Sequence, residues 1–590
     1  MINLLDYPFN NPMILRKRKA IRKELMQETY SRKIKIAVLG GSTTNELVNI
    51  LDLFLLKQGL LPSFYESEYN KYYEDALFGN DILSSFKPDI IYIHTTHENV
   101  SKFPSFGANS QTLESLLENE TLRFKSIWKS LESYNCPIIQ NNFDYPVNRS
   151  LGNLDCYDLH GKTFFLNRLN LSFAIEAQEN KSLFINDINY LSASIGLNKW
   201  FDKNLWFTAK YAISFEAIPA LANNITNIVT AILGMSKKCL VLDLDNTCWG
   251  GVIGDDGLNG IKLGNETPGG EAYLAFQKYV KELKDRGIIL AVCSKNEIQN
   301  AKEGFTHSDS VLTYSDFTSF YANWEPKHHN IEKIAKEINI DISSLVFVDD
   351  NPVERSLVKT QLPTVAVPDV GYNILDFIDH IEQNGYFSIA SLSDDDINRN
   401  KFYSENQKRA KEQTEFRNYD DFLSSLLMKA EIKVFKDAYL ERITQLINKT
   451  NQFNLTTRRY TITDVEAMAK SDDFIALYGK LTDKFGDNGL ISIVVGKVDG
   501  KKCVIDTWLM SCRVLKRDME FAMLDVLVKE CRKRGLIEIY GQYIRTAKNS
   551  MVAKFYSDMG FKLLESSEAE GLWKLKISNF KNKELTIKIN

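Results

Sequence analysis

The sequence lacks the features that mark several large classes of protein. Its eight cysteines include no CxxC pair and no disulfide-framework spacing, so we expect reduced thiols and a cytoplasmic location. No apolar run is long enough to span a bilayer, so we expect no membrane span. Neither charge is in excess, with 72 Lys and Arg against 76 Asp and Glu, which argues against a dedicated nucleic-acid binder.

The start of the chain also lacks the order of a secretory signal. The charged run RKRKAIRKE (16–24) follows a short apolar patch instead of preceding it. We expect this run to form the solvated face of a helix, although its charge would also suit an acidic partner. Internal repeats and low-complexity segments are absent from the sequence as well.

What the sequence does contain is a repeated pattern of strands and helices. Its 590 residues are enough for roughly three to four domains. Strand-like runs at 34–39, 89–94 and 136–144 each end in a polar loop, with helical apolar spacing between them. This alternation predicts an α/β fold with a parallel sheet covered on both faces, and we expect the first domain to span 1–225.

A second α/β domain is predicted over 236–386. Its strand-like runs at 237–245, 288–296 and 344–352 each end in polar or charged residues. Because ligands of open parallel sheets bind at the carboxyl ends of the strands, these ends are the place to look for a site.

Four short motifs of this second domain follow predicted strands in an order that points to one chemistry. Taken alone, each acidic pair is common as a helix cap. Together they supply paired carboxylates, a hydroxyl and an ammonium group. The motifs are DLDNT (243–247), CSKN (293–296), WEPK (324–327) and FVDDN (347–351).

Phosphoryl transfer to a carboxylate needs this set of groups. One aspartate attacks phosphorus, while another handles the proton of the leaving group. Clustered carboxylates repel one another, and Mg²⁺, which prefers oxygen ligands and phosphate, removes that conflict. A hydroxyl and an ammonium group then hold the phosphoryl oxygens as charge builds on them. The sequence therefore predicts Mg²⁺-dependent phosphoryl transfer.

The pattern resembles the haloacid dehalogenase (HAD) superfamily, which implies a Rossmann-like domain with Asp243 as nucleophile and Asp245 as acid/base. About 48 residues separate Asp245 from Ser294, and the expected helix 272–287 takes many of them. This spacing leaves room for only a minimal cap domain, so we expect an open site. An open site suits a phosphate carried by a large partner, or a site that another domain covers. The resemblance also implies that Ser294, Lys295 and Lys327 hold phosphate, and that Asp243, the Asp245 carbonyl, and Asp349 or Asp350 hold Mg²⁺.

Longer phrases carry a resemblance to the FkbH-like proteins over nearly the whole chain. It implies an SGNH-hydrolase-like domain, a HAD domain and a GNAT acetyltransferase-like α+β domain. It also implies that 1,3-bisphosphoglycerate is converted into a glyceryl group on an acyl carrier protein, with removal of phosphate. The phrases are DLDNTCWGGVIGDDG (243–257), QLINKTNQFNLTTRRY (445–460), FGDNGLISIVV (485–495) and DTWLMSCRVLKRDME (506–520).

Cys248 stands where HAD phosphatases usually have an aliphatic residue. A thiolate there can attack the acyl phosphate of 1,3-bisphosphoglycerate at carbon and give a thioester. Near Mg²⁺ and the turn amides, we expect the pKa of this thiol to fall. The alternative is that Cys248 fills a small apolar gap, because cysteine is among the most buried residue types.

The first domain carries part of an esterase site. The run LGGST (39–43) resembles the nucleophile block of SGNH hydrolases, with Ser42 as nucleophile and Asn141 as the oxyanion-hole candidate. The closing stretch, 200–222, holds none of the chain's seven histidines, and a serine without a base is a poor nucleophile. We therefore expect a non-hydrolytic domain that binds a partner or covers the HAD site.

The remaining residues are predicted to form a charged helical connector (387–430) and a GNAT-like domain (431–590). That fold holds the coenzyme A pyrophosphate on a glycine-rich turn, but the matching turn, RVLKRD (513–518), has Lys516 and Asp518 in place of small residues. Coenzyme A binding is therefore in doubt, while the pantetheine of a carrier protein would still fit. Secondary site candidates are Cys512, as an acyl relay or a core residue, and Arg513.

Two alternatives to glyceryl transfer stay open. One is a Mg²⁺-dependent phosphatase for a phosphorylated sugar or glycan intermediate of surface polysaccharide synthesis, a setting in which other relatives occur. The other is a non-enzymatic scaffold, against which the complete acid set argues. Cys248 separates the leading function from the sugar phosphatase, since only the former has a use for a thiolate.

Overall fold

The computed structural model describes residues 1–30, 32–546 and 548–589, except for the side chain of Cys512. The expected α/β fold class is confirmed: two parallel α/β sheets precede a domain built on a mixed sheet. Within these described ranges, no helix is both long and apolar enough to cross a membrane.

The described chain forms two compact units, Met1–Ala231 and Ile232–Asn590. Helix α10 (Ile218–Ile232) runs through residue 225, where the sequence analysis placed the end of the first domain. The first compact unit ends at Ala231, next to the last residue of this helix.

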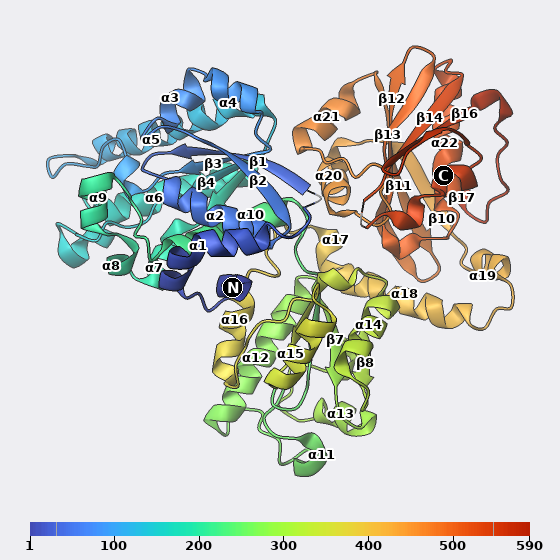
Figure 1. Ribbon diagram of the computed structural model, residues 1–590, viewed down its shortest axis with the longest axis horizontal. Helices are drawn as coiled ribbons and strands as arrows, with labels where there is room; N and C mark the ends of the chain where they lie inside the picture. Colours follow the sequence, from blue (N-terminus) through green and yellow to red (C-terminus); the bar gives the residue numbers. More distant parts are fainter. Residues whose placement is uncertain (31, 547, 590) are drawn as a thin grey trace. The chain divides into compact units, whose positions relative to one another are not determined.

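The first unit is built on a parallel sheet with helices on both faces (Figure 1). On one face, Ala37 and Leu39 of the second strand in the spatial order pack with Phe124 and Phe173, which come from two long helices. In spatial order, the strands are β2 (Leu60–Glu66), β1 (Arg32–Gly40), β3 (Ile90–His94), β4 (Ile138–Asn141) and β5 (Leu183–Asn186).

The charged run 16–24 lies in the first α-helix, as expected. Ile14 and Ile21 of this helix are buried, whereas Arg22 reaches Asp52 of the next long helix with an Nε–Oδ2 distance of 2.8 Å. The α-helices of this unit that precede α10 are α1 (Asn11–Leu25), α2 (Asn45–Lys57), α3 (Tyr72–Leu77), α4 (Asp81–Phe86), α5 (Ser110–Leu131), α6 (Lys162–Glu179), α7 (Ile188–Ile195), α8 (Leu197–Trp200) and α9 (Lys203–Ala209).

The second unit begins with a smaller parallel sheet. Three of its strands coincide with the predicted runs, because a continuous apolar stretch ends in polar residues in each. The edge strand 319–322 is absent from the sequence prediction, since its apolar stretch is only three residues long between Ser319 and Asn323. In spatial order, the strands are β8 (Ser319–Ala322), β7 (Ile289–Ser294), β6 (Cys239–Leu242) and β9 (Leu345–Val348).

Helix α12 (Pro268–Asp285) accounts for the helix expected between the first two motifs. The Thr267 hydroxyl accepts a hydrogen bond from the Gly270 amide, and Pro268 opens the helix where no amide donor is needed. The other helices of this part are α11 (Ile253–Asp256), α13 (Ile298–Gly304), α14 (Lys327–Ile338), α15 (Pro352–Gln361) and α16 (Phe377–Gln383).

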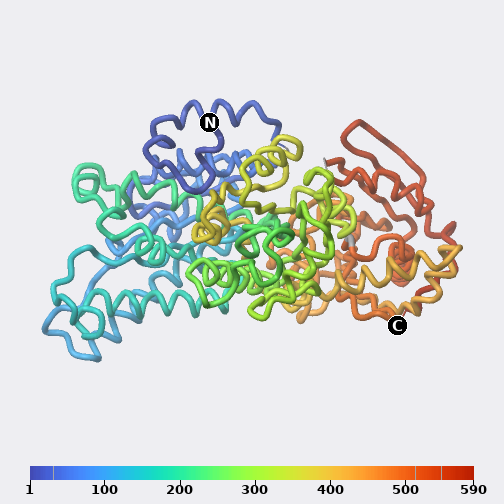
Figure 2. Tube along the Cα trace, turned by 90° about the horizontal axis from the view of Figure 1, so that it is seen from below, coloured from blue at the N-terminus to red at the C-terminus, as the bar shows by residue number. Residues whose placement is uncertain are grey.

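The charged connector is helical, as the sequence predicts. It forms α17 (Asp394–Ile397), α18 (Arg399–Gln413) and α19 (Tyr419–Ser425), drawn in yellow to orange in Figures 1 and 2. Charged side chains dominate α18, but Phe402 and Tyr403 are buried, so one side of this helix packs against the protein.

The C-terminal domain is a mixed sheet with helices between its strands. Its helices are α20 (Leu440–Lys449), α21 (Ile462–Lys470), α22 (Met519–Lys533) and α23 (Phe555–Asp558). In spatial order, its strands are β15 (Lys562–Ser566), β16 (Glu570–Lys576), β14 (Glu538–Ile544), β13 (Lys502–Met510), β12 (Gly486–Asp499), β11 (Phe474–Asp483), β10 (Lys429–Val434) and β17 (Lys588–Ile589).

Candidate active site

The four motifs of the second unit meet at the carboxyl edge of its parallel sheet. Asp243 follows β6, Ser294 ends β7, Lys327 opens α14 after β8, and Asp349 follows β9. The Asp243 amide donates to the Val348 carbonyl at 3.0 Å, which ties the ends of the neighbouring strands β6 and β9 together. Parallel pairing therefore gathers groups that lie up to about a hundred residues apart in the sequence.

A buried ammonium group joins two of the acids. Lys327 is 3% exposed, and its Nζ lies 3.0 Å from Asp243 Oδ1 and 2.5 Å from Asp349 Oδ2. Burial alone lowers the pKa of Lys327, but the carboxylates of Asp243 and Asp349 outweigh it and raise the pKa above its ordinary value. Lys327 is therefore a fixed positive charge at the centre of the site.

The carboxylates are arranged as a cation site. One oxygen each of Asp243, Asp349 and Asp350 lies within 4.8 Å of the others. Burial, followed by the charge of Asp243, raises the pKa of Asp349 to about 7 and that of Asp350 to about 6. An all-oxygen donor set under this mutual repulsion fits a small hard cation such as Mg²⁺.

Asp245 is held apart from this cluster by three N–H donors. The Trp249 indole and the Ile253 amide donate to Oδ1 at 2.9 and 3.1 Å. The Asn296 side chain donates to Oδ2 at 3.0 Å. Burial nevertheless raises the pKa of Asp245. Asn296 escaped the sequence analysis, although it is the last residue of the CSKN motif.

A buried arginine also missing from the sequence prediction shapes the loop that carries Asp349 and Asp350. Arg355 Nη1 donates to the backbone carbonyls of these two residues at 2.8 and 2.7 Å. Its Nη2 pairs with Asp369 at 2.9 Å. Because these contacts hold the loop backbone, Arg355 fixes the direction in which both carboxylates point. Its sequence signal is only a cation one helical turn into α15.

Two expected phosphate ligands differ in their surroundings. Ser294 is 2% exposed at the end of β7. Lys295 instead turns to Glu354, with an Nζ–Oε1 distance of 2.6 Å. Lys295 follows the end of β7 in a bend, and its side chain is directed to Glu354. The structure thus engages Lys295 in an ion pair outside the carboxylate cluster.

Cys248 corrects one expectation about the thiol. Its side chain is fully buried among apolar residues such as Leu240 and Phe276, and its Sγ donates to the Asp243 carbonyl at 3.3 Å. Burial, followed by the charges of Asp243 and Asp245, raises the thiol pKa well above its ordinary value, where the sequence analysis expects it to fall. The resting structure therefore holds Cys248 as a protonated thiol.

In the first unit, Ser42 lies where β1 leads into α2. It is 2% exposed, and the neighbouring Gly41 carbonyl accepts a hydrogen bond from the Asn99 side chain at 2.8 Å. A Cβ on Gly41 would lie 2.5 Å from that side chain, so the close approach requires glycine. Asn99, rather than the expected Asn141, is thus the amide beside the serine loop.

Asn141 belongs to a buried polar network instead. Its Oδ1 accepts from Tyr92 at 3.0 Å and from Asn186 at 2.7 Å, while its Nδ2 donates to the Thr95 carbonyl at 3.1 Å. With both ends of the amide engaged inside the sheet, Asn141 has a structural role in this conformation.

A histidine of the first unit pairs with a buried acid. His97 Nδ1 lies 3.0 Å from Asp144 Oδ1, and the Trp200 indole donates to the other oxygen at 2.9 Å. Burial alone lowers the pKa of His97, but Asp144 and then Glu98 raise it to about 10. His97 is therefore protonated near neutral pH and has no free nitrogen to serve as a base.

The secondary candidates of the C-terminal domain lie in the turn after β13. Arg513 stacks on Phe402 of α18, with its guanidinium carbon 4.4 Å from the ring centre, and approaches Asp395 at 3.6 Å. Cys512 is in a 3₁₀ turn (Cys512–Val514), and its side chain lies outside the described part of the structure.

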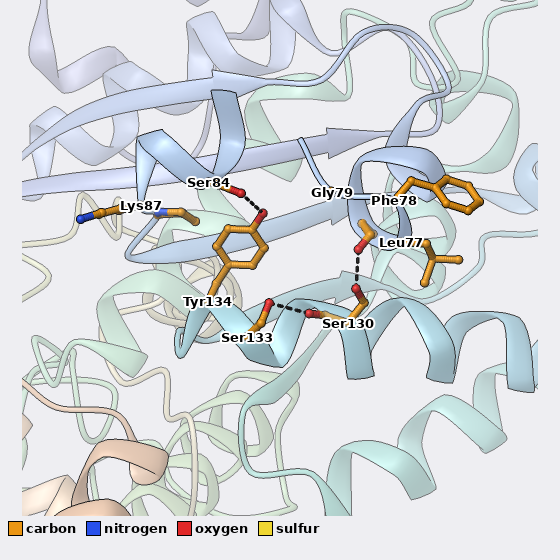
Figure 3. A pocket seen from close by; sticks show the side chains of 10 residues that line it. Leu77, Phe78, Gly79, Ser84, Lys87, Ser130, Ser133 and Tyr134 are labelled. Carbon is orange, nitrogen blue, oxygen red and sulfur yellow. Dashed lines mark hydrogen bonds between the residues drawn. The ribbon is translucent and has the colours of Figure 1, made fainter. Parts of the chain in front are cut away.

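A separate hollow of about 610 Å³ lies on the first unit (Figure 3). Tyr134 and Lys87 line it together with small polar residues, and the Tyr134 hydroxyl lies 3.3 Å from Ser84 Oγ. No residue that the sequence analysis singled out lines this hollow.

Comparisons with known proteins connect both units to described folds. The family described as FkbH, N-terminal domain, matches residues 35–230. A crystal structure of the N-terminal part of the protein BF1531 from Bacteroides fragilis, containing the phosphatase domain and complexed with Mg, is 31% identical to this chain. That match covers 64% of this chain and 99% of the other, with a TM-score of 0.58. Among curated proteins, no match was found.

Two acetyltransferase structures are similar to smaller parts. The ribosomal-protein-S18-alanine N-acetyltransferase from Escherichia coli is 12% identical and covers 26% of this chain and 98% of its own, with a TM-score of 0.21. The PaiA N-acetyltransferase from Thermoplasma acidophilum, in complex with coenzyme A, is 16% identical and covers 25% and 99%, with a TM-score of 0.19.

Proposed function

The chain belongs to the FkbH-like family and is a HAD-type phosphatase, and on this premise we propose that it removes phosphate from 1,3-bisphosphoglycerate and loads the glyceryl group onto an acyl carrier protein. The observation that carries the phosphatase part is Lys327, buried between Asp243 and Asp349 beside a third acid. The acyl part rests on the resemblance of the long motifs and on a thiol next to the nucleophile.

Asp243 and Asp245 divide the phosphoryl chemistry between them. A carboxylate oxygen of Asp243 bonds to phosphorus while the bond to the leaving oxygen breaks, and Asp245 gives that oxygen a proton. Asp245 then takes a proton from a water molecule, whose oxygen attacks phosphorus and frees Asp243. The hydrogen bonds from Trp249 and Asn296 keep the Asp245 carboxylate turned toward the leaving group and away from Asp243.

The other groups of the site bind and orient the phosphoryl group. Mg²⁺, held by Asp243, Asp349, Asp350 and the Asp245 carbonyl, supplies positive charge against the phosphoryl oxygens when bound. Lys327 and Ser294 hold these oxygens from the strand side, and Arg355 keeps the acidic loop in place. Lys295 is left out of this set because Glu354 already neutralises it.

Cys248 accepts the glyceryl group in this proposal. Its sulfur bonds to the acyl carbon of 1,3-bisphosphoglycerate as the bond from that carbon to the phosphate oxygen breaks, and the phosphate leaves with the thiol proton; Asp243 then removes the remaining phosphate. The pantetheine thiol of the carrier finally attacks the thioester and frees Cys248. Because the resting thiol is covered and protonated, the segment 244–250 must open before this step.

Replacing Cys248 separates the two chemistries. We expect Cys248→Ala to stop carrier loading while phosphate release from a simple phosphate ester stays within a few-fold, because Asp243 acts on phosphorus without the thiol. The measurements are phosphate release and the intact mass of the carrier after incubation with 1,3-bisphosphoglycerate. A hydroxylamine-labile mass increase on Cys248 in the parent protein identifies the thioester.

Cys293→Ala is the matched control, since Cys293 is equally buried and its Sγ lies 3.5 Å from the Lys327 carbonyl. This variant should keep both activities. If the Cys248→Ala variant still loads the carrier, the glyceryl group passes directly and the thioester step is wrong. If the parent protein never loads a carrier but hydrolyses sugar phosphates, the sugar-phosphatase alternative is the better account.

The first unit has a non-catalytic role in the proposal. Ser42→Ala is expected to leave phosphate release and carrier loading within a few-fold, because His97 is protonated and Asn141 is engaged elsewhere. Esterase activity toward a small ester such as p-nitrophenyl acetate is the direct readout. Ester hydrolysis that disappears in Ser42→Ala would show that another group serves as the base.

A further inference from the structure

In the C-terminal domain, the parallel strands β13 and β14 separate partway along their length, where the extended arm of coenzyme A would have to enter. β13 pairs with β14 only over Lys502–Ile505 and Glu538–Gly541. Beyond this point each strand keeps its other neighbour, since β12 pairs with β13 up to Met510 and β16 with β14 up to Ile544. The gap leads to the turn 513–518, on which the GNAT-like fold would hold a pyrophosphate.

A segment of the chain itself fills this gap. The Leu455 amide donates to the Trp508 carbonyl at 3.0 Å, and the Met510 amide donates to the Phe453 carbonyl at 3.0 Å. On the other side, the Ile544 amide donates to the Leu455 carbonyl at 2.8 Å. Residues 453–456, here called the insert, therefore bond to both separated strands in the manner of an extra strand.

The insert is part of the core rather than a cover over it. Asn454 and Leu455 are fully buried, and Phe453 packs edge-on against Phe555, with the ring centres 5.2 Å apart. The buried Asn549 side chain donates to the Asn454 carbonyl at 2.9 Å and so satisfies a backbone group that the strands leave over. A ligand could enter the gap only by displacing these contacts.

The connector, 387–430, covers the turn 513–518. Asp395 of α17 pairs with Arg442 at 2.9 Å and approaches Arg513 at 3.6 Å, so a carboxylate lies against the arginine at the start of the turn. Further along the turn, Arg517 Nη2 donates to Asn406 of α18 at 3.0 Å. The Tyr419 hydroxyl donates to the Lys516 carbonyl at 2.7 Å.

We propose that the C-terminal domain is closed to coenzyme A thioesters, because the insert occupies the place of an extended arm and the connector occupies the place of the pyrophosphate. The domain then binds the connector, and the Asp395 carboxylate takes the position of an anionic phosphate beside Arg442 and Arg513. This inference concerns a different domain from the phosphatase site, so neither proposal depends on the other.

Hydrogen exchange of the full-length protein with and without coenzyme A tests the insert. Backbone amides that are bonded on both sides in a core exchange slowly. We expect peptides covering 451–458 to exchange as slowly as those of β13, with no change and no thermal shift on adding millimolar coenzyme A or acetyl-CoA. Fast exchange of 451–458 that slows with coenzyme A, or saturable binding of coenzyme A or acetyl-CoA, would overturn the proposal.

Neutralising the stand-in carboxylate tests the connector. Asp395→Asn leaves Arg442 and Arg513 without their anion, so inorganic pyrophosphate is expected to raise the melting temperature of this variant and not that of the parent protein. Asp394→Asn, one residue away and exposed, is the control and should behave like the parent. If pyrophosphate stabilises the parent equally, or fails to stabilise Asp395→Asn, Asp395 does not stand in for a phosphate.

Discussion

Asp243→Asn is expected to lower the rate of phosphate release by about a thousandfold or more, because an amide cannot attack phosphorus in place of a carboxylate. The side chain keeps its shape and size, so far-ultraviolet circular dichroism and thermal unfolding should still show a folded protein. Phosphate release at saturating Mg²⁺ is the measurement.

Asp255→Asn is the matched control for this change. Asp255 lies in α11, twelve residues after Asp243, and its side chain is exposed. The rate of phosphate release by Asp255→Asn should equal that of the parent protein. Mg²⁺-dependent turnover that survives in Asp243→Asn as it does in Asp255→Asn would remove Asp243 from the nucleophile's role.

Lys327→Met is expected to lower phosphate release by about a hundredfold to a thousandfold, since a positive charge aimed at the phosphoryl oxygens is lost from a buried site. Methionine retains most of the side-chain volume. The loss also leaves Asp243 and Asp349 without the ammonium group that lies within 3.0 Å of both, so the metal-free variant should melt at a lower temperature.

Lys295→Met distinguishes this effect from a general loss of positive charge near the site. Lys295 is partly exposed and pairs with Glu354, so this variant should keep its activity within a few-fold. Equal losses in the two variants would instead return Lys295 to the phosphate-binding set that the sequence suggested.

The strands that carry the acids could be predicted because each is a continuous apolar run with a polar end. β6, β7 and β9 have this form, and parallel pairing then brings Asp243, Ser294 and Asp349 to one edge. β8 could not be predicted in the same way, because its apolar stretch is only three residues long.

Residues that support the site were harder to find than those that react. Asn296 acts through a hydrogen bond to Asp245, which lies far away in the sequence, and Arg355 acts through the backbone carbonyls of Asp349 and Asp350; no spacing rule reveals such contacts. The ion pair of Lys295 with Glu354 could not be predicted either, since Glu354 lies far away in the sequence. For Cys248, proximity to the metal site suggested a lowered thiol pKa. Burial of the side chain raises that pKa instead.

In the flanking domains, the sequence showed which residue types were missing but not what took their place. Lys516 and Asp518 indicated a poor pyrophosphate turn, yet only the structure places Asp395 and the insert there. The lack of a histidine in the closing stretch, 200–222, indicated that Ser42 has no base, and the protonated state of His97 agrees with this. Asn99 could be recognised only from its contact with Gly41.

Peptide mapping by mass spectrometry after acid quench, with the Asp245→Asn variant, Mg²⁺ and substrate, tests the central claim most directly. Without the acid/base, hydrolysis of the phosphoryl-enzyme should be slower than its formation, so the intermediate should accumulate. We predict the mass of one phosphoryl group on the peptide that contains Asp243, dependent on Mg²⁺ and absent from Asp243→Asn. A phosphoryl group on any other residue, or turnover in the parent protein with no phosphoryl-enzyme in either protein, would contradict the account.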